Sequence, residues 1–171
     1  MTENNRHRVL ISDAISEFGI EVLRKSERVD LLPDITPQDL LSKIGAYDAL
    51  IVRSRTKVTS EVVEAGVRLR VIGRAGVGVD NVDLDACRSQ GVIVVNSPMA
   101  AGIAVAELTL GLILSLARCI PYADSKMKDG QWPKQEINGV ELHGKVLGLI
   151  AVGRIGTEVA RRAAALEMRV I

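Results

Sequence analysis

Short apolar runs alternate with amphipathic stretches over the first 95 residues, and this alternation restricts the fold more than any other feature of the chain. The stretches between the runs carry apolar residues at helical spacing. Strands that alternate with helices of this length are joined by right-handed crossovers and build a parallel sheet. We therefore predict a flavodoxin-like α/β domain. Its five expected strands are residues 9–12, 29–32, 49–52, 70–73 and 91–95.

Local signals mark where the intervening helices begin. Thr36 precedes Pro37, which places a capping hydroxyl ahead of a proline in the first helical turn. Thr59 and Asp83 precede the next two helical stretches in the same way. Aromatic residues make up only 2% of the chain. The core must therefore consist of Val, Ile, Leu and Ala, which suits a parallel sheet covered by helices on both faces.

A change of pattern after the fifth run predicts a domain boundary. Pro98 disfavours helix at Ser97 and cannot donate a hydrogen bond to a neighbouring strand. We therefore place the boundary after residue 97. Beyond it we expect a long apolar helix over 103–120, ended by Pro121, and a second helix over 123–128.

Residues 145–171 have the order of a dinucleotide-binding βαβ unit: an apolar strand, a glycine turn, an Ala-rich helix and the start of a second strand. Gly153 and Gly156 allow a tight turn and close packing, and the amides at the helix start can hold a pyrophosphate. Ala151 stands where the first glycine of Gly-x-Gly-x-x-Gly is expected, and a positive φ there would cost on the order of 1 kcal/mol. The acidic residue that would bind the ribose is expected about 20 residues past the glycines, roughly where the sequence stops. We expect residues 170–171 to lie unpaired at the edge of this sheet.

Two loops that follow neighbouring strands carry the cationic side chains. One spans residues 53–57 (Arg-Ser-Arg-Thr-Lys) and the other spans residues 74–81. Ligands of open α/β sheets gather at the carboxyl ends of the strands, and arginines beside exposed amides suit a carboxylate or a phosphate. We expect Arg53 and Arg74 to form one cationic pocket. Solvated loop charges are expected at Arg55 and Lys57.

Composition excludes several classes of protein. A net charge of +1 and the shortage of aromatic residues argue against nucleic-acid binding. Cys87 and Cys119 have no disulfide or metal-ligand spacing, and we expect no metal. The start of the chain lacks a signal-peptide pattern, and the longest apolar stretch, 103–117, is shorter than the roughly 20 residues of a membrane span. We expect a cytoplasmic protein without a membrane partner. Surface, packing or structural roles are expected for His7, His143, Trp132 and Glu107.

Six segments, in order and with matching spacing, give the chain a specific resemblance: 50–54, 71–83, 96–98, 106–107, 128–132 and 144–148. On these segments the sequence closely resembles the D-isomer-specific 2-hydroxyacid dehydrogenases, and among them the members that act on 3-phosphoglycerate. The resemblance covers essentially the whole chain. It implies hydride transfer between the 2-hydroxyl carbon of the substrate and NAD. The parent activity would be oxidation of 3-phosphoglycerate to 3-phosphohydroxypyruvate, a step of serine biosynthesis.

The resemblance also implies roles for the two parts of the chain and for single residues. Residues 1–97 would form the substrate domain, normally completed by a C-terminal return of the chain, and residues 98–171 the incomplete beginning of a Rossmann NAD-binding domain. The implied contacts to the substrate's phosphate and carboxylate are Arg53, Ser54 and Arg74. The amides implied to face the substrate are those of Gly76, Val77 and Gly78, and Val77 would also face the nicotinamide. The implied pyrophosphate contacts are Gly153, Arg154, Ile155 and Gly156. The full-length protein would be a homo-oligomer.

Three departures from the family pattern bear on activity. Residues 100–102 read Ala-Ala-Gly where the family usually has Gly-Asn-Thr or Gly-Asn-Ser, and Ala151 replaces a glycine. The catalytic arginine, glutamate and histidine that the resemblance implies lie beyond Ile171. We therefore name no catalytic residue and expect this chain alone to be inactive. Two alternatives stay open: a non-catalytic shortened relative that binds an anion or a partner, and another 2-hydroxyacid dehydrogenase such as a glyoxylate or hydroxypyruvate reductase.

Overall fold

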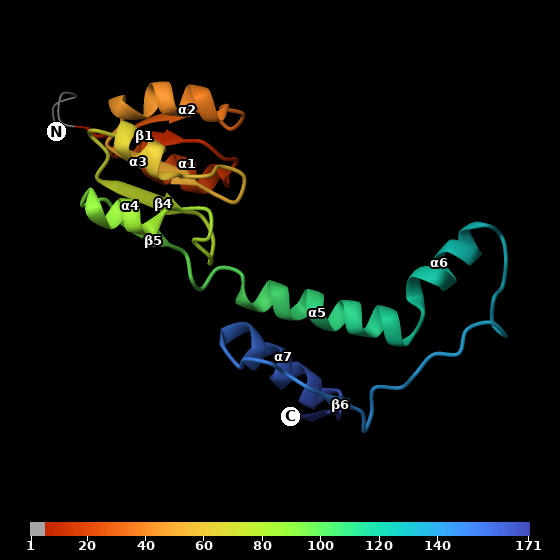
Figure 1. Cartoon of the computed structure of the whole chain (residues 1–171). Helices are drawn as coiled ribbons and strands as arrows, with labels where there is room; N and C mark the ends of the chain where they lie inside the picture. Colours follow the sequence, from red (N-terminus) through yellow and green to blue (C-terminus); the bar gives the residue numbers. More distant parts are fainter. Residues whose placement is uncertain (1–5) are drawn as a thin grey trace. The chain divides into compact units, whose positions relative to one another are not determined.

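The computed structural model describes residues 6–171, and the chain divides into two compact units, Met1–Ala100 and Ala101–Ile171 (Figure 1). The first unit alternates strands and helices throughout. Its elements are β1 (Arg8–Ile11), α1 (Glu17–Arg24), β2 (Arg28–Leu31), α2 (Pro37–Lys43), a 3-10 turn (Ile44–Ala46), β3 (Ala49–Val52), α3 (Ser60–Ala65), β4 (Val71–Arg74), α4 (Leu84–Ser89) and β5 (Ile93–Asn96).

The strands of the first unit form one parallel sheet in the order β2-β1-β3-β4-β5. This is the flavodoxin-like strand order, so the predicted fold class is confirmed. Each strand lies where a strand was predicted, with shifted ends. β4 continues to Arg74, and β5 begins only at Ile93 because Gly91, with φ of +70°, still belongs to the turn after α4.

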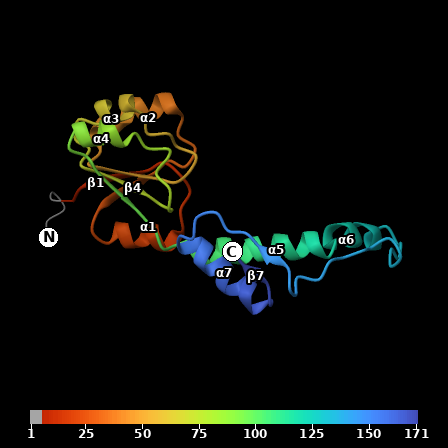
Figure 2. The same ribbon diagram turned by 60° about the horizontal axis from the view of Figure 1, so that its bottom comes forward.

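Helices cover the two faces of this sheet unequally: α2, α3 and α4 lie on one side of the strands and α1 on the other (Figure 2). On the first face, Leu10, Leu50 and Ile72 are fully buried. Because successive residues of a strand point to opposite faces, Val9 and Ile11 point the other way and pack with α1. Only the β1–β2 crossover runs in the reverse direction across the sheet, so right-handed connections leave α1 alone on its face.

The α1 face is open at β5. Val94 packs with the α2–α4 side, so Ile93 and Val95 point to the α1 face, where they are 63% and 50% exposed. A mainly apolar pocket of about 440 Å³ borders this part of the face and is lined by Ile93 and Val71 among others. Helices therefore cover this face near β1, as predicted, but not at β5.

Two predicted helix starts are confirmed by capping hydrogen bonds. Thr36 accepts from a first-turn amide of α2 at 3.1 Å, with Pro37 following it. Asp83 accepts from a first-turn amide of α4 at 2.9 Å. Thr59 also stands at the N-cap of α3, but its hydroxyl makes no capping hydrogen bond.

The second unit corrects the predicted helix boundary. Its elements are α5 (Gly102–Ala117), α6 (Ile120–Lys128), β6 (Val146–Leu147), α7 (Arg154–Ala165) and β7 (Arg169–Val170). A single helix over 103–120 is wrong, because α5 ends at Ala117 and Cys119 adopts a left-handed φ of 54°. Pro121 lies in the first turn of α6, where a proline is well accommodated, so it begins the second helix instead of ending the first.

The two short strands of this unit pair with each other in parallel, so the expectation that residues 170–171 are unpaired is wrong. Ile171 N–H donates to Leu147 O at 3.0 Å. α7 packs on α5, and the residues buried between them are Ala106, Leu110 and Val159. Within residues 6–171 no single helix is long and apolar enough to cross a membrane. Helices α5 and α6 have the required length and apolar character only when they are taken together, and they are bent by 67° where they meet.

Candidate functional site

The two cationic loops start at the same edge of the five-stranded sheet. β3 and β4 are neighbours, with Val52 in register with Arg74. Arg53 is the first residue after β3, whereas Arg74 is the last residue of β4 itself. Ala75 N–H also donates to Val52 O at 2.8 Å. The sheet thus joins the two loops at its carboxyl edge, next to the β1–β3 position where the strand order reverses and where such folds bind ligands.

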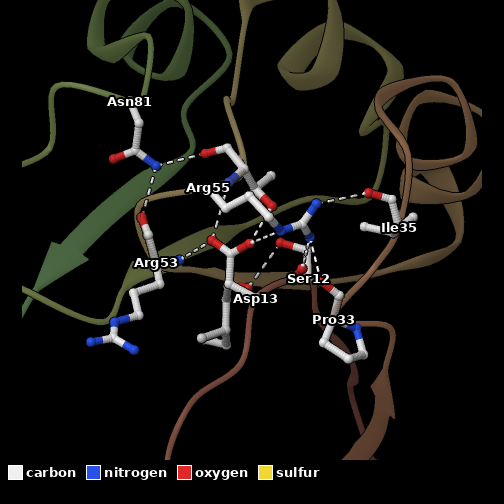
Figure 3. A network of polar contacts seen from close by, with 9 residues as sticks. Ser12, Asp13, Pro33, Ile35, Arg53, Arg55 and Asn81 are labelled. Atoms are coloured by element: carbon white, nitrogen blue, oxygen red, sulfur yellow. Dashed lines mark hydrogen bonds and ion pairs between the residues drawn. The ribbon is translucent and has the colours of Figure 1, made fainter.

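Arg53 is held by its main chain and extends its side chain away from the residues that hold it (Figure 3). Its amide donates to Asp13 Oδ2 at 2.5 Å, and its carbonyl accepts from Asn81 Nδ2 at 2.9 Å. The side chain is exposed, and its guanidinium has no hydrogen-bond or ion-pair partner within the described residues. The fold therefore fixes the backbone of this residue and leaves its charge available.

Arg55 is in the opposite situation. Its Nε lies 3.2 Å from Asp13 Oδ1, and its terminal nitrogens donate to three backbone carbonyls. Those carbonyls belong to Ser12, Pro33 and Ile35. The side chain of Arg55 is 51% exposed, but it is not the unpaired loop charge that was predicted, because it ties together the chain after β1, β2 and β3. Lys57 is exposed.

The buried carboxylate of Asp13 joins these contacts. Asp13 is 3% exposed and accepts from the amides of Arg53 and Thr56 and from the Thr56 hydroxyl. Burial by itself would raise the pKa of Asp13, but these hydrogen bonds and the charge of Arg55 hold that pKa below its ordinary value. No motif singled out Asp13, although its position directly behind the first strand placed it at the same sheet edge as Arg53.

Asn81 fastens the second loop to the first. Its Nδ2 donates to the carbonyls of Arg53 at 2.9 Å and Thr56 at 2.7 Å, and the residue is 5% exposed. Because both partners are acceptors, only the NH2 end of the amide can face them. Its Oδ1 is buried without a partner in the described part of the chain. The sequence placed Asn81 in the loop but gave no reason to assign it a role.

A pocket of about 270 Å³ opens beside Arg53. Arg74 does not border it, so in this structure the two arginines do not line one pocket. The lining residues are Asp13, Ala14, Pro33, Asp34, Arg53, Ser54 and Arg55. Because Asp13 and Arg55 pair with each other, the rim keeps one positive charge from Arg53 and one negative charge from Asp34.

Arg74 folds over Gly76. A Cβ on Gly76 would lie 1.5 Å from Arg74 Nη1, so a side chain there would displace the flexible end of Arg74, and the φ of +154° would strain any residue other than glycine. Arg74 is partly buried, and its Nε is buried without an acceptor within residues 6–171. Unsatisfied buried N–H groups are uncommon in folded proteins. Arg74 therefore has an N–H group without an acceptor, and this group lies beside the glycines of residues 74–81.

The loop of residues 74–81 is anchored near both ends and leaves two amide donors in its middle free. Gly76 N–H donates to Arg74 O at 2.8 Å, so this donor is already used within the loop. Val77 O accepts from Asn96 Nδ2 at 2.6 Å, which ties the loop to the end of β5. The amides of Val77 and Gly78 have no acceptor among the residues that the structure describes.

The turn between β6 and α7 combines a left-handed residue with a glycine at the helix N-cap. Ala151 has φ of +69°, so the left-handed conformation considered from the motif is present. Gly153 is the N-cap of α7 and has no side chain to cap the helix, so the amides of Ile155 and Gly156 have no acceptor among the described residues. A Cβ on Gly156 would lie 2.8 Å from Ala151 O, so only glycine permits this approach.

Residues 9–169 match the model of one protein family, described as the D-isomer specific 2-hydroxyacid dehydrogenase catalytic domain. The chain belongs to the D-isomer-specific 2-hydroxyacid dehydrogenases. It is 48% identical to the D-3-phosphoglycerate dehydrogenase of Methanocaldococcus jannaschii and 48% identical to the chloroplastic D-3-phosphoglycerate dehydrogenase 2 of Arabidopsis thaliana, over 96% of this chain in both cases. The match spans only 31% and 26% of the length of those two proteins.

Solved structures of other proteins share the fold of this chain. A protein from Thermus thermophilus superposes with a TM-score of 0.89 at 34% identity, over 95% of this chain and 54% of that chain. The NAD+-bound 3-phosphoglycerate dehydrogenase of Entamoeba histolytica gives 0.77 at 27% identity, over 96% and 53%. A glyoxylate reductase from Paecilomyes thermophila gives 0.86 at 25% identity, over 97% and 55%.

The structure also places the other residues of this 2-hydroxyacid dehydrogenase chain for which surface, packing or structural roles were predicted. His143 is exposed, as expected, and pairs with Glu167. Glu107 on α5 pairs with Arg162 on α7 at 3.3 Å, and its structural role stays a prediction. Trp132 is 75% exposed and so is not the packing residue that was predicted. Residues 6–171 contain no cluster of three or more His, Cys, Asp or Glu side chains able to hold a metal ion.

Proposed function

We propose that this chain is the substrate-binding part, and the start of the cofactor-binding part, of an NAD-dependent D-3-phosphoglycerate dehydrogenase. Residues 1–97 would be the substrate domain and residues 98–171 the beginning of the NAD-binding domain. The reaction would be oxidation of 3-phosphoglycerate to 3-phosphohydroxypyruvate. Arg53, Ser54 and Arg74 would hold the phosphate and the carboxylate of the acid.

The observation that carries this proposal is the state of Arg53. Its peptide groups are fixed by Asp13 and Asn81 while its guanidinium has no partner in the described residues. A planar guanidinium binds phosphate or carboxylate through two parallel hydrogen bonds, and a fixed backbone reduces the freedom lost on binding. Arg74, in register with the residue before Arg53, offers a second unused donor at the same edge. The two relatives at 48% identity bear the name of this dehydrogenase.

The start of α7 fits the pyrophosphate of NAD. Gly153, Arg154, Ile155 and Gly156 would hold it at the positive end of the helix, with the first-turn amides of Ile155 and Gly156 as donors. A Cβ on Gly153 would meet no atom within 4 Å, so the backbone is open to close approach. When bound, NAD supplies the acceptor of the hydride. The chain's own loops would hold and orient the acid.

We expect residues 1–171 alone to bind the acid without oxidising it. Oxidation of the 2-hydroxyl group requires a base that takes its proton. The sequence has two histidines. His7 precedes β1 and so lies at the sheet edge opposite the loops, and His143 is engaged with Glu167. The uncovered α1 face at β5 is compatible with a substrate domain that a later return of the chain completes.

A titration of the 15N-labelled chain with 3-phosphoglycerate, glycerate and glyoxylate tests the proposal. We expect saturable amide shifts in residues 53–56 and 74–78, with 3-phosphoglycerate bound most tightly because it alone carries a phosphate. Arg53→Met should weaken binding about tenfold or more, as expected for loss of a charge-assisted pair of hydrogen bonds.

Arg68→Met is the matched control for this titration, because it removes the same charge at the opposite edge, where Arg68 pairs with Asp48 at 3.1 Å. Equal binding of 3-phosphoglycerate and glycerate, or wild-type affinity in Arg53→Met, would refute the proposed site. Preference for glyoxylate would favour the reductase alternative. Formation of NADH by the purified chain with NAD and 3-phosphoglycerate would contradict the expected inactivity.

A further inference from the structure

Two buried side chains from different elements hold the peptide groups on either side of Arg53 (Figure 3). Asp13, after β1, accepts from the amide, and Asn81, in the loop after β4, donates to the carbonyl. Asn81 also donates to the carbonyl of Thr56. Asp13 and Asn81 are 3% and 5% exposed, and hydrogen bonds shielded from water in this way are stronger than exposed ones. The backbone of Arg53 is thus set from two directions.

We propose that Asn81 is a positioning residue for binding of the acid and acts through Arg53. This inference rests on the proposed function of the Arg53 loop. The Asn81 amide spans the carbonyls of Arg53 and Thr56, so it sets the curvature of the segment from which the Arg53 side chain departs. Asn81 itself does not touch the acid, because both hydrogens of its NH2 group are already donated to the protein and its Oδ1 is buried.

The chemistry of the side-chain amide explains why asparagine suits this position. An NH2 group has two hydrogens, and the site has two carbonyl oxygens to receive them. Aspartate has the same shape but would set a second acceptor against those carbonyls, whereas serine can donate to only one of them. Asn81 also belongs to the loop that carries Gly76 and Gly78.

A double-mutant cycle separates positioning from simple stability. The affinity for 3-phosphoglycerate is measured for the wild type, Asn81→Asp, Arg53→Met and the double variant. We expect Asn81→Asp to weaken binding about fivefold to tenfold, in line with the loss of two buried hydrogen bonds that position a charged group. In the Arg53→Met background the same substitution should have no further effect, because the side chain that Asn81 positions is gone.

Tyr47→Phe is the matched control, since it removes a buried side-chain hydrogen bond, to Asp30 at 2.8 Å, elsewhere in the same unit. It should leave the affinity unchanged. If Asn81→Asp does not fold, Asn81→Ser takes its place, with a loss of about twofold to fivefold expected because one donor remains. In either variant the Arg53 amide should exchange its hydrogen faster, while the Val63 amide in α3 should not.

The outcomes distinguish this inference from the proposed function. Wild-type affinity in the Asn81 variants, or an equal loss with and without Arg53, would overturn the positioning role and leave the anion site standing. No difference between the wild type and Arg53→Met would refute the anion site itself, and the inference with it. A cycle in which the effect of Asn81 vanishes without Arg53 would establish the inference.

Discussion

Replacing Ala151 by glycine should stabilise the second unit of the chain. Ala151 has φ of +69°, a conformation that costs an L-residue with a Cβ roughly 1–2 kcal/mol. Glycine removes this strain but adds freedom to the unfolded chain, worth about 0.4–1 kcal/mol. Ala151 is exposed, so its methyl group contributes no buried packing. The difference leaves a net stabilisation of roughly 0.5–1 kcal/mol.

Hydrogen exchange under native conditions measures this change. The amides of Leu149 and Ile171 hold β6 and β7 together, donating to Ile171 O at 2.8 Å and to Leu147 O at 3.0 Å. Their exchange reports opening of the second unit, and in Ala151→Gly it should slow by about twofold to fivefold. Ala160→Gly, in the middle of α7, makes the same chemical change at an ordinary helical position and should destabilise by about 1 kcal/mol. If both variants speed exchange, residue 151 does not hold the left-handed conformation and the reasoning fails.

Three further predictions concern single contacts. Gly156→Ala would set a Cβ 2.8 Å from Ala151 O and should destabilise the second unit by about 1–3 kcal/mol; unchanged exchange of its amides would contradict this. The pKa of Asp13 is lowered in the folded state, so its stabilisation is present above the unfolded pKa of about 4 and is lost as the pH falls through the lower folded value. The free energy of unfolding in urea should therefore fall less steeply with acid in Asp13→Asn than in the wild type, and equal slopes would count against the assignment. Arg55→Met should lower the free energy of unfolding of the first unit by about 1–2 kcal/mol, because three carbonyls lose their donor, while Arg53→Met should change it little; the reverse ranking would show that the two arginines have been confused.

The sheet and its order could be predicted because each apolar run is short and each connection has helical length. Handedness then leaves few arrangements. The break between α5 and α6 could not be predicted in the same way. A proline ends one helix as readily as it starts the next, so Pro121 by itself does not say which side of it is helical. The left-handed conformation of Cys119 separates the two helices, and no glycine in the neighbouring sequence indicates such a conformation.

The roles of the two arginines after β3 were beyond sequence reasoning for a different reason. Arg53 and Arg55 stand in one loop with similar neighbours. What separates them is a set of carbonyls from residues 12, 33 and 35, which the fold brings to Arg55 alone. The conformation of Ala151 was predictable because a glycine motif specifies backbone geometry directly. Contacts between segments 20 or 43 residues apart are not written in any local pattern.

Holding residue 53 through its peptide groups alone has a consequence for how such proteins diversify. Any L-amino acid except proline offers the same N–H and C=O to Asp13 and Asn81, so the identity of the side chain is uncoupled from folding. If Arg53 binds the acid as proposed, a single exchange at this position would alter which acid is accepted and would demand no compensating change in the scaffold. Residue 55 cannot be exchanged in this way, because its side chain holds three backbone carbonyls. A position that tolerates substitution and one that does not thus lie within three consecutive residues of the same loop.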